Sequence, residues 1–519
     1  HEPDANTYEW WFSAANFLQY GNNLQVVRAI ASTHKNAVAA SGANTALLIK
    51  NREHYDANYA DGSASAGHWG AKYPGSLGNS LKVGIADAGA NAAAYTAWSY
   101  SANFDGRPGT STYAAGRGAS NDEMHVIVVD EDGLFTGTAG QVLEKFAFVS
   151  KAADGKKDNG EGNYYVDIIN NQSQYIWWLD HKETNWGTNA NVGGTATAYT
   201  VMTPLNESLG NAGGAGVDGN AAVTDANWQT GAAKFANADE IDIQLFVGGP
   251  GRPHAAAAAG TANWTYMVDS IAATRKDCVV FLSPEYADVV NQPGSEVTNI
   301  TNASANGVRD VLSSSSYAVM DCNWKKQYDR YNDVFRWVPM NGDTAGLCVR
   351  TDTTDDPWYS PAGFTRGQVK NVLKLAWQPT KTERDAIYKV GVNPVVSFPG
   401  ECTVLFGDKT MLLKPSAFDR INVRRLFLVL EKSIAIAAKY SLFEFNDEFT
   451  RAQFKGMIDP FLRDVQGRRG IFDYKVVCDS SNNPSTVVDR NEFIADIYIK
   501  PARTINYIFL NFIATRSGV

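Results

Sequence analysis

The chain begins with a helical pattern and carries its clearest helix near the other end. Large apolar residues recur at helical spacing over residues 8–20, and the run at 22–30 predicts a short strand. A second helical pattern extends from about Phe418 to Tyr440, after a start signal formed by Ser416 and Asp419. Apolar residues in the middle of this helix surround its axis, so we expect it to be buried on most sides, with Leu426, Leu430 and Ile434 in the core.

The last hundred residues predict one more helix and three strands. The helix begins after Asn446 and is expected to break near Pro460. A further short helical stretch can start at Pro460, because the first position of a helix does not need the N–H group that proline lacks. The strands are expected at Ile471–Cys478, Phe493–Lys500 and Ile505–Ile513. The last of these is apolar on both faces, so it requires neighbours on its faces and edges.

The middle of the chain divides into two parts of different pattern. Residues 31–205 are rich in Ala, Gly, Asn, Ser and Thr, which predicts a β-rich insertion. Its strand-like islands are Leu81–Ile85, Met124–Val129, Leu143–Val149 and Tyr175–Leu179. Beyond it, the apolar runs EIDIQLFVGG (240–249) and KDCVVFLSP (276–284) flank a helical stretch. This is the pattern of a βαβ unit with buried parallel strands.

The fold class expected from these patterns is multidomain, combining α/β and α+β parts. A chain of 519 residues exceeds what one hydrophobic core usually organises, and 44% hydrophobic with 19% charged residues is typical of a globular protein. We expect a middle α/β domain of residues 1–30 and 206–395, the β-rich inserted domain of residues 31–205, and a C-terminal domain of residues 396–519 with helices and a three-stranded sheet. No apolar run is long enough for a membrane helix.

The charge distribution is uneven. The chain has a formal net charge of −9, yet residues 401–519 carry 17 Lys and Arg against 14 Asp and Glu. A basic C-terminal region would suit an acidic partner, although mixed-charge solvated surfaces commonly produce such a balance. The acidic total also disfavours nucleic acid as a partner.

Motifs for catalysis or cofactor binding are weak. Gly214, Gly216 and Gly219 match G-x-G-x-x-G by letter, but no strand precedes them, and dinucleotide binding requires one. The VGGPGRP segment (247–253) lacks the Lys-Ser/Thr of a P-loop, and the seven histidines show no metal-ligand spacing. The five cysteines are odd in number and far apart, as expected for reduced thiols. We therefore expect no catalytic residues, no metal and no cofactor.

Long segments of the chain closely resemble tail sheath proteins of T4-like myoviruses. Together they cover residues 7–30 and about 205–519. They are FLQYGNNLQVVRA near the start, KKQYDRYNDVFRWVPMNGDTAGLCVRTD (Lys325–Asp352), DPWYSPAGFTRGQVKNV (Asp356–Val372), LFGDKTMLLKPSAFDRINVRRLFLVLEKSI (Leu405–Ile434) and VVDRNEFIADIYIKPARTINYIFLNFIAT (Val487–Thr515). The loop with Gly213-Gly214 and Asp218-Gly219 also recurs in sheath proteins, which explains the letter match without a nucleotide.

The resemblance implies a structural subunit and no enzyme. Such a subunit polymerises as stacked hexameric rings around the tail tube and switches from an extended to a contracted state, driving the tube through the host envelope. The C-terminal domain would lie at small radius and the inserted domain would face outward. The implied partners are other copies of the chain, the tail tube protein, and baseplate and tail terminator proteins, with no nucleic acid and no membrane insertion. The implied location is the tail sheath of a virion, assembled in the host cytoplasm.

The sequence departs from the family pattern in three places. Family members have an N-terminal arm before the FLQYGN helix, and the chain begins at His1 close to that helix, which suggests a fragment of a longer product. The large outermost domain of T4-type sheaths is expected to be missing after the first strand, and the C-terminal arm is expected to be short beyond Val519.

The basic residues of the C-terminal region are the candidates for contacts with the tube or with neighbouring subunits, because arginine suits bidentate pairing with carboxylates. An intradomain role is the alternative, for example with Arg424 pairing with a buried acid. The candidates are Arg420, Arg424, Arg425, Arg468, Arg469 and Arg490. Two other classes of protein remain open: a carbohydrate-active enzyme, and a non-contractile structural protein such as a tube or surface-layer component.

Overall fold

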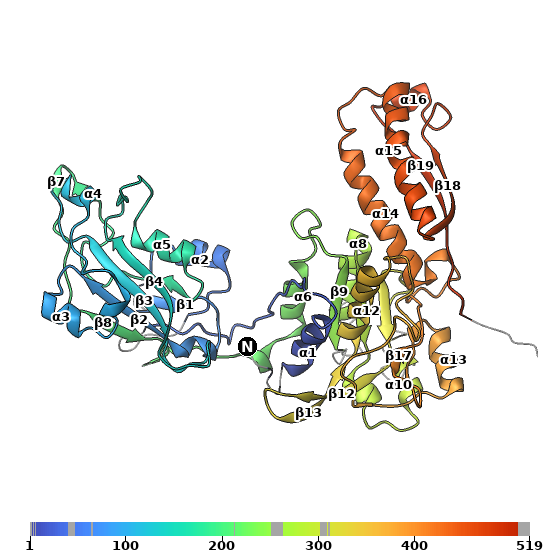
Figure 1. Ribbon diagram of the computed structural model, residues 1–519, viewed down its shortest axis with the longest axis horizontal. Helices are drawn as coiled ribbons and strands as arrows, with labels where there is room; N and C mark the ends of the chain where they lie inside the picture. The colour runs from blue at the N-terminus through green and yellow to red at the C-terminus, as the bar shows by residue number, and fades with distance from the viewer. Residues whose placement is uncertain are drawn as a thin grey trace, which may run out of the picture. The chain divides into compact units, whose positions relative to one another are not determined.

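The protein is a mixed α/β protein with several separate sheets (Figure 1). The computed structural model describes residues 3, 5, 7–39, 47–63, 66–211, 213–250, 263–301, 309 and 312–506. Residues 29–224 form one compact unit, called unit 1, and residues 2–28 together with residues 225–519 form unit 2. The three domains predicted from the sequence are a finer division and stay a prediction.

Unit 1 consists mostly of antiparallel strands with short helices. The helices and 3₁₀ turns are α2 (Arg52–Asn58), η1 (Ser76–Ser80), α3 (Ala92–Ala97), η2 (Ser101–Asn103), α4 (Thr112–Ala115), α5 (Tyr165–Gln172) and η3 (Asn220–Ala222). The strands are β1 (Trp69–Ala71), β2 (Leu81–Asp87), β3 (Glu123–Asp130), β4 (Gln141–Ser150), β5 (Ile176–Trp178), β6 (Asn191–Val192), β7 (Thr195–Ala196) and β8 (Leu205–Ser208). The main sheet has the order β4-β3-β2-β8, and β1 pairs with β5. The four predicted strand-like islands thus correspond to β2, β3, β4 and β5.

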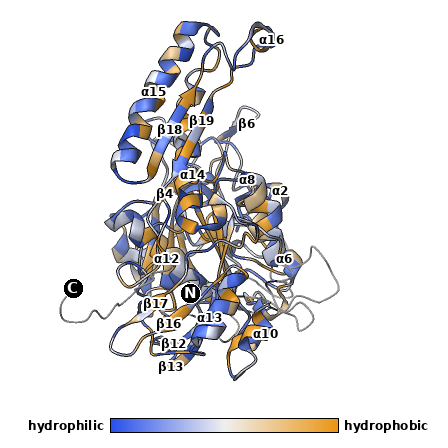
Figure 2. Cartoon of the chain, turned by 90° about the vertical axis from the view of Figure 1, so that its right-hand side faces the viewer, coloured by the Kyte–Doolittle hydropathy of each residue, from blue (hydrophilic) through white to orange (hydrophobic). Residues whose placement is uncertain are grey.

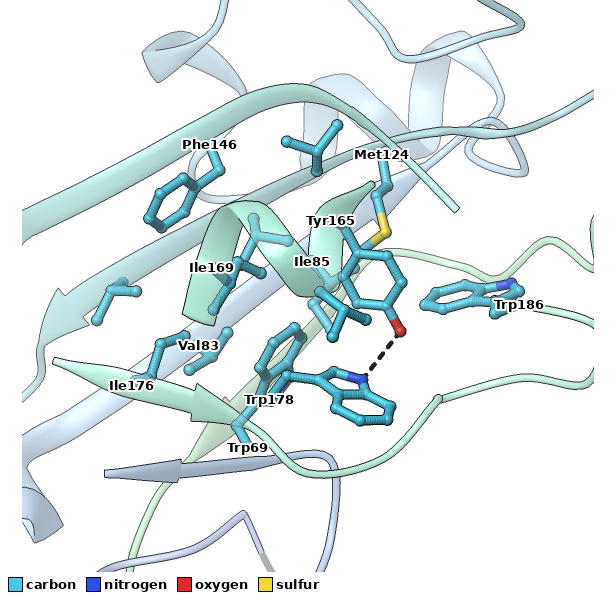
Figure 3. Packing of buried hydrophobic residues seen from close by; sticks show 14 of the residues in the cluster. Trp69, Val83, Ile85, Met124, Phe146, Tyr165, Ile169, Ile176, Trp178 and Trp186 are labelled. Atoms are coloured by element: carbon cyan, nitrogen blue, oxygen red, sulfur yellow. Dashed lines mark hydrogen bonds between the residues drawn. The ribbon is translucent and has the colours of Figure 1, made fainter. Parts of the chain in front are cut away.

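The core of unit 1 lies between the main sheet, α5 and the β1–β5 ladder (Figure 3). Val83 and Ile85 of β2 point to the same side because successive strand residues alternate, and they meet Ile169 of α5 there. The indole Nε1 of Trp178 donates a hydrogen bond to the hydroxyl of Tyr165 at 3.1 Å. Burying these two aromatic rings with their polar atoms hydrogen-bonded contributes to the stability of the unit.

Unit 2 holds the parallel sheet and the longer helices. Its helical segments are α1 (Tyr8–Phe17), α6 (Asp225–Ala233), α7 (Asn263–Thr265), the π-helical segment η4 (Tyr266–Ala272), α8 (Ala273–Arg275), α9 (Tyr286–Val289), α10 (Glu296–Thr301), α12 (Asn341–Thr354), α13 (Lys381–Lys389), the 3₁₀ turn η6 (Ala417–Asp419), α14 (Ile421–Lys439), α15 (Glu448–Gly467) and α16 (Ser485–Val488). Its strands are β9 (Leu245–Pro250), β10 (Val279–Ser283), β11 (Ala318–Asp321), β12 (Trp324–Asp329), β13 (Val334–Pro339), β14 (Lys374–Leu375), β15 (Val392–Asn393), β16 (Val395–Ser397), β17 (Thr403–Leu405), β18 (Ile471–Val477) and β19 (Asp496–Pro501).

The sheet β15-β11-β10-β9 is parallel throughout, which confirms the predicted βαβ unit. Alternate side chains of β10 pack into two different cores, one on each face of the sheet. Val280 and Leu282 pack against the helical segment 263–275, whereas Val279 and Phe281 pack against residues of α1, α12 and α14. Both faces of the sheet are therefore covered, which explains why these strands read as continuous apolar runs.

Residues 22–30 do not form the predicted strand. The described part of the chain offers this segment no ladder partner, and the structure records no strand there. Leu24 and Val27 instead pack separately onto the two cores that flank the parallel sheet. The apolar residues that suggested a strand therefore anchor this connection to the two cores through their side chains.

The helix after Asn446 is not broken at Pro460, contrary to the sequence prediction. α15 is continuous from Glu448 to Gly467 with Pro460 inside it. Phe454 and Ile458 precede the proline and Leu462 follows it, and all three are buried on one face. Their burial outweighs the one backbone hydrogen bond that proline removes.

Two of the three predicted C-terminal strands are present as β18 and β19, with the second starting three residues later than expected. The third, Ile505–Ile513, lies outside the described residues except for Ile505 and Asn506, which are not in a strand.

Candidate assembly surface

Two long helices and a β-hairpin form the C-terminal part of unit 2. α15 packs against both α14 and β18, and Figures 1 and 2 show the two strands lying alongside α15. The shared core contains Leu426 and Leu430 from α14, Leu462 from α15 and Val476 from β18. Leu426 and Leu430 are thus buried as expected, and Ile434 packs partly buried against the same cluster.

The hairpin leaves backbone groups available for further pairing. β18 and β19 pair antiparallel, with Tyr474 opposite Ile499 and Lys475 opposite Tyr498. Within the described residues this sheet has two strands only, so each strand has one paired edge and one outer edge. An outer edge with free N–H and C=O groups is a template for a strand from another segment or another chain.

The connection between α14 and α15, together with the first turn of α15, exposes large apolar side chains. We call these residues the apolar tip: Tyr440, Leu442, Phe443, Phe445 and Phe449. Phe443 is fully exposed and Phe445 is 86% exposed. Five exposed apolar residues within ten positions form the kind of surface that proteins use for binding other proteins. No sequence prediction covers these residues, although aromatic side chains alternating with acidic ones between two predicted helices are a usable signal.

Arg424 and Arg425, two of the six predicted interface arginines, lie in the interior of unit 2. Arg424 Nη2 donates to Ser316 Oγ at 2.8 Å, and its guanidinium stacks over the rings of Tyr317 and Phe418. Burial lowers the pKa of this guanidinium. The side chain is therefore held by a hydroxyl and by aromatic faces, and none of the described carboxylates forms an ion pair with it at hydrogen-bond distance.

Arg425 joins α14 to α12. Its Nη2 lies 2.5 Å from Asp352 Oδ2, and its Nη1 donates to the carbonyl oxygen of Cys348 at 3.4 Å. With the guanidinium almost fully buried, these contacts fix the position of α14 on the helix that covers the parallel sheet.

Arg420 lies at the N-terminal end of α14, partly exposed. Its Nη1 donates to Asp408 Oδ1 at 3.0 Å and to the hydroxyl of Tyr388 at 2.5 Å, and its Nε lies 3.5 Å from Asp419. The side chain thus connects the start of α14 to α13 and to the loop after β17.

The remaining three arginines are exposed. Arg468 pairs with Asp356 and lies over the ring of Trp358, and Arg490 donates to Glu492 at 2.8 Å. Arg469 is exposed at the end of α15, with a backbone φ of 67° and no recorded side-chain bond to the described residues. The structure therefore brings Arg468 and Arg469 together at the end of α15 and places Arg490 in the α16 turn, apart from Arg424 and Arg425.

The glycine-rich loop of unit 1 packs against the protein itself. Val38 N donates to Gly214 O at 2.9 Å, and Gly216 N donates to Asn79 Oδ1 at 2.7 Å. A Cβ atom added at Gly216 would lie 2.2 Å from the carbonyl oxygen of Gly75. Close backbone packing, which only glycine permits, accounts for this loop.

None of the helices in the described residues is both long enough and apolar enough to cross a bilayer. The same part of the chain contains no group of three or more His, Cys, Asp or Glu residues arranged to hold a metal ion.

Two family models together match more than half of the chain. The model of the phage tail sheath protein central domain matches residues 214–411, and the model of the phage tail sheath C-terminal domain matches residues 414–515. A solved sheath tail protein from Listeria innocua aligns with a TM-score of 0.47 and 11% identity, over 83% of this chain and 78% of that one.

Two phage proteins of known identity are similar at the sequence level. The tail sheath protein of Vibrio phage KVP40 is 43% identical over 77% of this chain, and the match spans 56% of that protein's own length. The tail sheath protein of Enterobacteria phage T4 is 35% identical over 100% of this chain and 90% of its own length. With both domain models matched and the T4 protein aligned along the whole chain, this chain belongs to the phage tail sheath family.

Proposed function

We propose that the chain is a structural subunit of a contractile phage tail sheath. It polymerises as stacked hexameric rings around the tail tube and drives the tube through the host envelope by changing from an extended to a contracted state. The observation that carries this proposal is the match of both the central and the C-terminal sheath domain models, which together span residues 214–515 apart from a short gap.

The proposed arrangement assigns a role to each predicted domain. The C-terminal domain, residues 396–519, lies at small radius against the tube, the middle α/β domain of residues 1–30 and 206–395 lies outside it, and residues 31–205 face outward. The tail tube, baseplate and tail terminator proteins are the proposed partners besides other copies of the chain, and assembly takes place in the host cytoplasm. The subunit catalyses no reaction in this proposal.

Two surfaces of the C-terminal part support assembly. The outer edges of β18 and β19 can accept strands from neighbouring copies through main-chain hydrogen bonds. The apolar tip offers a second contact, whose burial is favourable at roughly 25 cal/mol per Å² of apolar surface. Of the six arginines, Arg468, Arg469 and Arg490 are the ones whose exposure suits them to contacts with the tube or with neighbours.

A polymer of this kind needs no nucleotide to contract. A head-to-tail interface repeated around and along an axis produces a helical assembly, and one rigid subunit can pack in two alternative ways. The extended packing is kinetically trapped, so that the free energy released on contraction is stored during assembly.

The test is electron microscopy of the full-length chain expressed with its tube protein, before and after mild urea or acid. Two tubular forms are expected, one long and thin, the other short and wide. A single unchanging polymer would instead identify a non-contractile structural protein. Isolated subunits without any polymer would contradict the proposal that the chain forms a sheath.

A further inference from the structure

Asp408 is the meeting point of five separate segments of unit 2. It follows β17, and its side chain is 5% exposed. Its Oδ1 accepts hydrogen bonds from Tyr388 at 3.1 Å and from Arg420 at 3.0 Å, and its Oδ2 accepts one from Ser360 Oγ at 3.2 Å. These partners come from α13, from the start of α14 and from the loop before β14. With the segment of Asp408 itself they make four, and the fifth segment is the chain that leaves β19.

That last segment reaches Asp408 through two polar side chains. Thr504 Oγ1 donates to Asp408 Oδ2 at 2.7 Å, and Asn506 Nδ2 donates to Asp408 Oδ1 at 3.1 Å. Asn506 Nδ2 also donates to the hydroxyl of Tyr388 at 2.5 Å. Ile505 between them is 82% exposed, so no apolar side chain of this segment replaces the polar contacts.

The electrostatics of the group suit a permanent anchor. The Arg420 guanidinium lies beside the Asp408 carboxylate and compensates its charge in a site that excludes most water. Burial, followed by the negative charge of Asp408, raises the pKa of the Tyr388 hydroxyl well above its usual range. Tyr388 therefore remains a neutral donor to Asp408 and an acceptor from Arg420 and Asn506.

We propose that Asp408, Tyr388 and Arg420 form a clasp that holds Thr504 and Asn506 and fixes where the C-terminal segment leaves the subunit. Residues 507–513 have the sequence YIFLNFI, which is strongly apolar and suited to pairing with another strand. The proposal rests on the proposed sheath function: Asp408 is the positioning residue for the contact that this segment makes with a second copy of the chain.

The structure provides a chemical reporter for the clasp. Arg503 is exposed and directly precedes Thr504, so trypsin can cleave between them only when residues 503–506 leave the clasp and enter the protease as an extended segment. Cleavage after Lys500 does not compete, because Pro501 follows it. The truncated product that ends at Arg503 can be followed by intact mass spectrometry of the full-length chain.

The variants are Asp408→Asn and Thr504→Val, with Asp419→Asn as the matched control. Asp419 also lies beside Arg420, at 3.5 Å, but has no recorded side-chain contact with residues 504–506. Removing hydrogen bonds to a charged group should increase the rate of cleavage after Arg503 about tenfold in the first two variants and leave it unchanged in the control. Thr504→Val leaves the other bonds of Asp408 in place, so it tests the clasp even where Asp408→Asn disturbs folding.

Assembly is measured with the same proteins as the concentration of chain at which polymer first forms with the tube protein. Faster cleavage together with at least a severalfold rise in this concentration supports the clasp. Unchanged cleavage in both variants, or faster cleavage with unchanged assembly, overturns it. If the unmodified chain forms no polymer at all, the sheath function fails instead, and the cleavage rates still decide whether the clasp holds the segment.

Discussion

Two buried ionisable groups of unit 2 have measurable consequences at the scale of single residues. Lys325 and Asp343 are both fully buried and form an ion pair, with Nζ and Oδ2 2.8 Å apart. Lys325 also donates to the carbonyl oxygen of Lys370, and Asp343 accepts from Tyr20 at 3.1 Å. The pair therefore ties β12 and α12 to the segment that follows α1.

Replacing Lys325 by Met should destabilise unit 2 by about 3–5 kcal/mol, because it leaves the carboxylate of Asp343 buried without its cation. The midpoint of urea unfolding, followed by tryptophan fluorescence, measures this loss. Lys326→Met, at the partly exposed neighbouring position, is the control and should change stability by less than about 0.5 kcal/mol. Equal effects of the two substitutions would mean that the buried pair contributes nothing beyond its packing.

Asp321 predicts a pH dependence of stability. Complete burial raises the pKa of this carboxyl to about 8, while hydrogen bonds from Ser283 and from the Asn323 backbone oppose the rise. Because the folded pKa exceeds that of the unfolded chain, the contribution of Asp321 is fully present at acidic pH and is lost as the pH rises towards 8. The melting temperature should therefore decline more steeply between pH 5 and pH 8 in the natural chain than in Asp321→Asn. Identical slopes would contradict this assignment.

At the scale of elements, tertiary packing decides whether a segment adopts the secondary structure that its local sequence predicts. Pro460 should end a helix, yet α15 continues through it because its apolar face packs on β18 and α14. In contrast, residues 22–30 look like a strand, but a strand requires a partner for its backbone groups, and the fold supplies none among the described residues.

Pro460→Ala should stabilise α15. Pro460 is exposed, so the substitution removes little packing, and alanine restores an N–H group that can bond the carbonyl oxygen of Gly456. The expected gain is about 1–3 kcal/mol, reduced by the greater freedom of alanine in the unfolded chain. Differential scanning calorimetry measures it, with Gln453→Ala in the same helix as control. A loss of stability would show that the proline is needed in the folded state.

At the scale of the whole molecule, exposed apolar side chains can be replaced to test assembly without changing the stability of the fold. The Phe443→Ser, Phe445→Ser double variant changes residues that contribute nothing to the core, so its melting temperature should match that of the natural chain. Polymer formation with the tube protein should weaken at least tenfold, as measured by sedimentation. Leu134→Ser, at a 60% exposed position of unit 1, is the control. Equal sedimentation of the double variant and the control would exclude the apolar tip as an assembly contact.

The sequence by itself determined the parts that depend on local pattern and on long similar segments. Alternation and apolar runs predicted β2, β3, β9 and β10, and helical spacing predicted α14. The segments resembling tail sheath proteins identified the family, which the domain models and the phage relatives confirm.

Only the tertiary structure decided which polar residues are buried, which are exposed and which of them contact one another. Arg424 and Arg425 follow Arg420 within one to two helical turns, yet the packing of α14 places these two inside and leaves Arg420 partly exposed. Asp408 gave no signal in the sequence, because its partners come from segments about 20 to 100 residues away except for Arg420. Exposure and partnership are set by long-range packing, and that information is absent from the local pattern along the chain.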